Sequence, residues 1–132
     1  MAKRIKAIGT YRPRIALQKR AGMDQLVHFI SRSTGLNESG VRHVLLELRD
    51  AVVFFNQQGQ SVKLDGLGTY FPAVGLDGSF TVGHRPDGFL KTRLNVPHSF
   101  YGTILNGENI GKTSDELVAM WNEEHPDDPI TP

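Results

Sequence analysis

Apolar residues recur every three or four positions between residues 23 and 58, which is the period of an amphipathic helix. The pattern predicts a first helix at about Met23–Ser33, closed by Gly35. Asn37 is a favourable N-cap for a second helix of about twenty residues that ends near Gly59. This second helix is apolar on two sides, more than a short helix of the same chain can cover. The excess predicts a homodimer.

From Ser61 onward the period changes to two, which predicts short antiparallel strands. Pro72 within one of them marks an edge or a bulge. Strands are expected at 61–65, 70–74, 80–82 and 90–96, with turns at 66–68, 76–78 and 85–88. In the last strand Lys91, Arg93 and Asn95 are expected on one face.

The two ends of the chain have weaker patterns. Residues 1–22 alternate loosely and are interrupted by Gly9 and Pro13, which predicts an extended arm. Residues 98–112 are expected to form a loop. A capping box at Thr113–Glu116 begins a short helix that ends by His125, with Trp121 as its anchor on the body. An arm, two helices, a small antiparallel sheet and one more helix make an α+β fold.

Charge is unevenly distributed along the chain, although its net value is only +1. Residues 1–22 carry seven bases and no acid, residues 23–107 are neutral, and residues 108–132 have a net charge of −6. We therefore expect three parts: a basic N-terminal extension, a body and an acidic C-terminal segment. An anionic partner for the extension is one interpretation. In the alternative, the two ends neutralise each other, within the chain or across a dimer.

Composition excludes several classes of protein. The chain of 132 residues has no cysteine, hence no disulfide framework or thiolate chemistry. Its longest apolar run, residues 51–55, is too short for a membrane helix. Residues 1–4 are not followed by the apolar stretch of a secretory signal, so we expect a cytoplasmic protein without membrane contact.

The chemical motifs in the sequence do not form a catalytic site. Residues 107–113 end in Gly-Lys-Thr, but Asn106 stands where a phosphate-binding loop needs glycine. The five histidines form no metal-type pair, and the acids of the body are scattered singly. We expect no enzyme activity, no metal, no cofactor and no small-molecule substrate.

Residues 62–70 read Val-Lys-Leu-Asp-Gly-Leu-Gly-Thr-Tyr and follow a short and a long predicted helix. This arrangement resembles the HU/IHF family of bacterial histone-like DNA-binding proteins, in which a turn of this form joins two strands. The resemblance covers about residues 23–100, and the match is weaker at Val96, Pro97 and Phe100. It implies an HU/IHF-like fold with a β-arm, an intertwined homodimer, double-stranded DNA as partner and a place in the nucleoid. The charged ends are similar to those of a divergent branch of the family.

The chain also departs from the family pattern. Members carry Arg-Asn-Pro near the tip of a long basic arm, and this sequence has none, which leaves DNA bending open. We expect a histone-like architectural protein of low sequence specificity that contacts phosphates and the minor groove. The alternative is a protein-interaction or assembly module on the same fold. The residues expected to contact DNA, mainly those of the N-terminal extension, are Lys3, Arg4, Lys6, Arg12, Arg14, Lys19, Arg20, Arg85, Lys91 and Arg93.

Overall fold

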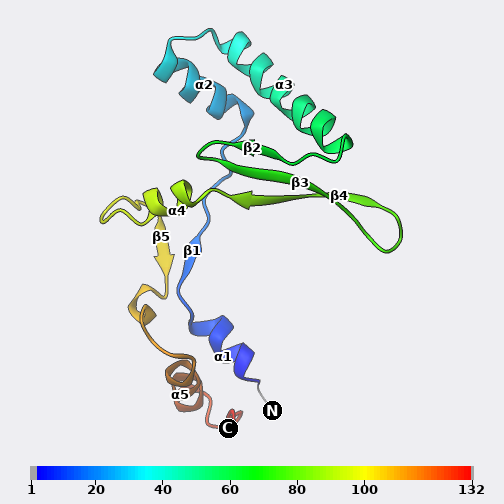
Figure 1. The fold of residues 1–132 in the computed structure, drawn as a ribbon. Coiled ribbons are helices and arrows are strands. Elements are labelled where there is room, and N and C mark those ends of the chain that lie inside the picture. The colour runs from blue at the N-terminus through cyan, green and yellow to red at the C-terminus, as the bar shows by residue number, and fades with distance from the viewer. Residues whose placement is uncertain (1–2, 132) are drawn as a thin grey trace. The chain divides into compact units, whose positions relative to one another are not determined.

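The structure, a computed structural model, describes residues 3–131. The chain divides into two compact units, which are described separately. Unit 1 combines the N-terminal segment up to Lys19 with the C-terminal segment from Tyr101 onward, and unit 2 is Arg20–Phe100. Helices and small antiparallel sheets occur together in the chain, so the expected α+β class is confirmed (Figure 1).

Unit 2 begins with the two helices that the sequence predicts. Helix α2 spans Met23–Thr34 and α3 spans Glu38–Gln57. The Asn37 side chain accepts a 2.9 Å hydrogen bond from the Ser39 backbone N–H, which satisfies one of the free donors at the start of α3. The period of the apolar residues and the N-cap therefore located both helices correctly.

Three antiparallel strands follow in the order β2–β3–β4. They are β2 (Val62–Leu64), β3 (Gly68–Val74) and β4 (Phe80–Pro86). Pro72 pairs with Val82 on β4, but the pairing of β2 with β3 stops at Val62 opposite Tyr70. On its other side, Pro72 therefore lies on a free edge of the sheet, as its missing N–H requires.

Gly68 at the start of β3 has a backbone conformation that side chains rarely adopt, with φ +150°. A Cβ there would lie 2.5 Å from the Arg85 carbonyl oxygen and 2.5 Å from His84 Nε2. The preceding Gly66 has φ +78°. The turn expected at 66–68 thus depends on backbone conformations that glycine adopts readily.

The predicted fourth strand at 90–96 and the turn at 85–88 are wrong. Arg85 and Pro86 belong to β4, and residues Gly88–Leu94 form helix α4. Asp87 caps this helix by accepting a 2.8 Å hydrogen bond from the Phe89 N–H. Leu90 and Leu94 are four positions apart, and both a helix and an alternating strand place such residues on one face. The apolar pattern therefore fits both periods, and the cap favours the helix.

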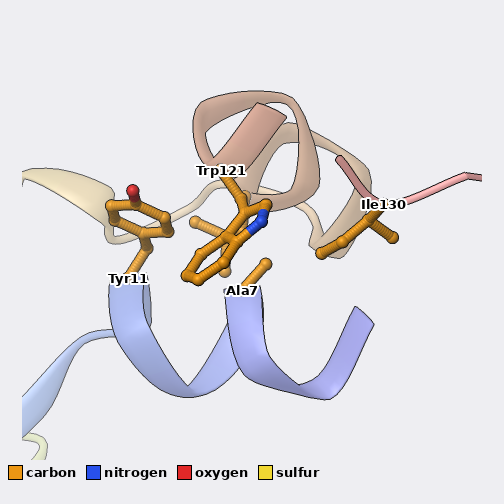
Figure 2. Packing of buried hydrophobic residues seen from close by; sticks show 5 residues of the cluster. Ala7, Tyr11, Trp121 and Ile130 are labelled. Carbon is orange, nitrogen blue, oxygen red and sulfur yellow. The ribbon is translucent and has the colours of Figure 1, made fainter. Parts of the chain in front are cut away.

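The expectation of an extended arm at residues 1–22 is wrong over its first half. Residues Arg4–Tyr11 form helix α1, and Arg14–Ala16 form strand β1. Ala7 and Tyr11, four positions apart, are buried against Leu117, Trp121 and Ile130 of the C-terminal segment (Figure 2). Burial of this apolar stripe stabilises the helix, because an isolated helix of eight residues is unstable in water.

The C-terminal segment contains more structure than the loop expected at 98–112. Strand β5 (Thr103–Leu105) pairs antiparallel with β1, and a 3₁₀ turn, η1, spans Gly107–Asn109. Helix α5 spans Ser114–Glu124, and Thr113 accepts a 3.2 Å hydrogen bond from the Glu116 N–H. Thr113 is therefore confirmed as the N-cap, but Glu116 Oε1 accepts from the Thr113 hydroxyl at 3.4 Å and not from its backbone N–H, so the reciprocal bond of a capping box is not formed. Trp121 anchors α5 on α1, and not on the body as expected.

Among residues 3–131, no helix is both long enough and apolar enough to cross a membrane.

Candidate nucleic-acid interface

The seven cations expected to bind DNA from the N-terminal extension do not lie on one free arm. Arg4 and Lys6 are in α1, with Lys3 before it, Arg12 follows it, and Arg14 is in β1. Lys19 and Arg20 stand in the segment that joins the two units. The structure thus distributes these residues over a helix, a strand and a connecting segment.

Three of these cations already have partners within unit 1, and one of them is Arg14, whose Nη1 donates a 3.5 Å hydrogen bond to the Gly9 carbonyl. Arg4 Nη2 lies 2.5 Å from Asp115 Oδ1, and Lys6 Nζ lies 5.1 Å from the centroid of the Trp121 ring. Unit 1 contains seven basic and seven acidic residues in total, so it is neutral. This pairing supports the interpretation that the two charged ends neutralise each other within the chain.

Unit 2 provides a different cationic surface, on one face of its sheet. The register aligns Lys63 of β2 with Thr69 of β3, and Thr69 with Arg85 of β4. Because side chains of directly opposed residues lie on the same face, the three form one row across the sheet. Phe71 stands on this face in the next row, opposite Gly83. We call this surface the Lys63–Arg85 face.

The other face of the sheet is apolar and lies against α3. It carries residues such as Val62, Tyr70, Val74 and Val82. Helix α3 contacts β2 and β3, and its residues Val53 and Asn56 line a cleft together with Pro72, Val74 and Val82 of this face. The Lys63–Arg85 face is therefore the one turned away from the helix. Lys63 and Arg85 are exposed on it and make no ion pair within residues 3–131.

The hairpin that extends beyond this row is not basic. Residues 65–84 include neither lysine nor arginine. Asp77 lies at the tip, where two hydrogen bonds from Ser79 lower the pKa of its carboxyl below the usual range, so the tip is negative at neutral pH. Val74, Leu76 and Phe80 are exposed around it. The hairpin thus lacks the phosphate contacts expected of a DNA-binding arm.

The remaining predicted site residues lie on α4. Lys91 and Arg93 are two positions apart in a helix, so they point in different directions and not to one face as expected. The Arg93 guanidinium lies 5.7 Å from the centroid of the Phe89 ring. Both are in the last turn, where positive charge is favourable to the helix dipole.

Lys63 is not among the residues that the sequence predicts to contact DNA. It stands between Val62 and Leu64, and the strand period places it on the face opposite to theirs. The pairing of β2 with β3 and of β3 with β4 then aligns it with Arg85, 22 positions later. Its alternation with apolar neighbours was a usable signal, but the partner strand could not be assigned without the register.

Comparison with known proteins points to one family. Residues 3–81 match the family model described as an HU domain fused to wHTH, Ig, or glycine-rich motif. Among solved structures, an HU mutant from Thermotoga maritima is 14% identical, with a TM-score of 0.49, and the match covers 56% of this chain and 99% of that one. An Anabaena HU–DNA cocrystal structure is 11% identical, with a TM-score of 0.48, covering 58% and 100%. No curated protein matches the chain significantly.

Proposed function

Because the chain belongs to the family of HU domains fused to a wHTH, Ig or glycine-rich motif, we propose that it is a DNA-binding, histone-like architectural protein. The Lys63–Arg85 face carries the proposal: an exposed row of two cations and a threonine hydroxyl on an antiparallel sheet. Such side chains bind phosphate oxygens without regard to base identity. Low sequence specificity follows. Where the cations of this row reach between phosphates they would contact the minor groove, in which little base identity can be read.

We further propose that the binding form is a homodimer. In unit 2 the only apolar side chains that are fully buried are Val27 and Val41, while Phe29, Val44 and Phe54 are more than half exposed. So little burial does not offset the conformational entropy of ordering about 80 residues, roughly 1–2 kcal/mol each. A second copy that covers α2 and α3 supplies the missing core.

A cleft beside α3 supports this association. It has a volume of about 700 Å³ and is lined largely by apolar side chains of α3 and the hairpin, among them Val53, Pro72 and Phe80. Asn56 also lines it. A second copy would fill the apolar volume of this cleft.

The proposal is tested by titrating fluorescently labelled duplexes of unrelated sequence with the full-length protein and measuring anisotropy at about 50 mM salt, where phosphate contacts are strong. Linear, nicked and cruciform duplexes are compared in parallel. We expect saturable binding whose affinity varies little with sequence. Absence of binding to every duplex by a folded dimer would overturn the proposal.

A second candidate function, protein interaction or assembly, is favoured by the hairpin alone. Its tip is negative and exposes Val74, Leu76 and Phe80, which suits a protein contact better than a phosphate backbone. A folded dimer that binds no duplex but co-sediments as larger assemblies, and loses them on Leu76→Asp substitution, would favour this function over DNA binding.

A further inference from the structure

On the Lys63–Arg85 face, the ring of Phe71 lies against the side chain of Arg85. Arg85 Cζ is 4.5 Å from the ring centroid, within the distance of a cation–π contact. We propose that Phe71 is a positioning residue for the Arg85 guanidinium, and that Gly83 is glycine because the ring must lie across it. The inference rests on the proposed function, since the ligand that Arg85 would bind is a DNA phosphate.

Gly83 gives the ring its place. It is the direct cross-strand partner of Phe71. A Cβ at Gly83 would lie 2.3 Å from Phe71 Cζ and 2.5 Å from Cε2, far inside van der Waals contact. The ring therefore crosses from β3 over the bare backbone of β4. There it meets Arg85, two residues along β4 on the same face.

The contact orders the guanidinium without occupying its donors. Among the described residues, no hydrogen bond or ion pair involves the Arg85 side chain. A guanidinium that stacks on a ring keeps its N–H edges available for a bidentate phosphate contact. It also has fewer rotamers to lose on binding, so the free energy of association is more favourable than for an unrestrained arginine.

The same contact argues against the ring as a platform for a DNA base. The Phe71 ring lies against the backbone of Gly83 and also contacts the Arg85 guanidinium. The Phe71 side chain is half-buried as a result. Base stacking needs a free π-face. The structure thus assigns the phosphate-binding group to Arg85 and its support to Phe71.

The experiment measures the DNA affinity of the full chain for wild type, Phe71→Leu, Gly83→Ala, Arg85→Gln and the double variant Phe71→Leu/Arg85→Gln. Phe71→Tyr tests rescue, because tyrosine retains the cation–π face. Thr81→Ala is the matched control: Thr81 is on the same face, one cross-strand residue pair beyond Phe71 and Gly83 and two beyond the row. Circular dichroism and sedimentation check that each variant remains folded and associated.

We expect Phe71→Leu and Gly83→Ala to weaken binding about two- to fivefold, because each frees the guanidinium while keeping its charge. In the Arg85→Gln background, Phe71→Leu should have no further effect, since coupled residues are not additive. Phe71→Tyr and Thr81→Ala should bind like wild type. Equal losses with and without Arg85 would overturn the positioning role, as would full affinity in Phe71→Leu. If wild type itself binds no DNA, the failure is that of the proposed function.

Discussion

The side-chain amide of Asn109 donates a 2.7 Å hydrogen bond to the backbone carbonyl of Tyr11, 98 positions earlier in the chain. Asn109 is 2% exposed, and its own side-chain oxygen accepts from Lys112 Nζ at 2.9 Å. The bond ties the end of α1 to the turn before α5. It makes the N-terminal segment part of a folded unit and not a free arm.

Substitution Asn109→Leu should therefore destabilise unit 1 by about 1–3 kcal/mol, because it leaves the Tyr11 carbonyl unpaired in a buried place. Trp121 is the sole tryptophan and lies in the same core, so its fluorescence reports unfolding of unit 1 directly. Arg4→Gln is the control, since the Arg4–Asp115 pair is exposed and should contribute under about 1 kcal/mol. A larger loss in Arg4→Gln than in Asn109→Leu would contradict this account.

The Tyr11 hydroxyl gives unit 1 a pH dependence in alkaline solution. Its hydrogen bond to the Glu124 carboxylate, its burial and the negative charge of Glu124 together raise the pKa of Tyr11 from 10.0 to about 12. The neutral form is thus favoured in the folded state. Its stabilising contribution should be complete below pH 10 and lost as the pH rises toward about 12.

Tyrosinate absorbance of the native protein should include a step near pH 12 that belongs to Tyr11. In Tyr11→Phe this late step should disappear. If the late step persists in Tyr11→Phe, another tyrosine is responsible and the hydrogen bond to Glu124 is not the cause.

The turn before β3 should not accept a side chain at Gly68. Gly68→Val must overcome a φ of +150° and contacts of 2.5 Å with the Arg85 carbonyl and His84, so we expect a loss of at least about 1–3 kcal/mol in unit 2. Thermal unfolding followed by circular dichroism measures it. Gly78→Val is a contrasting variant: its φ of +84° is also unfavourable, but a Cβ there meets no atom within 4 Å, so the loss should be smaller.

The exposed apolar side of α3 should make folding of unit 2 dependent on association. Phe54 and Phe55 contact each other edge to face, with ring centroids 5.2 Å apart, and both are exposed in the single chain. Phe55→Asp should abolish the dimer and most helical signal, since an unpaired buried charge costs several kcal/mol. Leu17→Asp, at an 89% exposed position in unit 1, should change neither. Sedimentation equilibrium that gives a folded 14.6 kDa monomer for the wild type would contradict the dimer.

Local signals predicted much of unit 2, because caps, glycine turns and a long amphipathic period act within a few residues. Asn37, Gly68 and the period of α3 are examples. The errors have two causes, which are contacts with distant elements and competition between local signals. Helix α1 depends on its packing against α5, more than 100 positions away. Helix α4 depends on its N-cap Asp87, which outweighs the strand-like alternation of residues 90–96.

The candidate site was predictable only in part for the same reason. Arg85 was identified from its charge, but its neighbours Lys63 and Phe71 are defined by the register of three strands. Charge sums could not show that the basic and acidic ends pack together as α1 and α5. Consequently, deletion of residues 1–20 would also unfold unit 1, and substitution of single charges is the cleaner test of DNA contacts.

The salt dependence of duplex binding tests the central claim most directly. It is measured for wild type, for the double variant Lys63→Gln/Arg85→Gln and for the quadruple variant Arg12→Gln/Arg14→Gln/Lys19→Gln/Arg20→Gln. Each phosphate contact contributes about −0.9 to the slope of log K against log salt, so two Lys63–Arg85 faces in a dimer predict a slope of about −3 to −4, steeper if the N-terminal cations also bind. The double variant should flatten the slope by about that amount while remaining a folded dimer. An unchanged slope in the double variant, or no measurable binding by wild type at about 50 mM salt, would contradict the account.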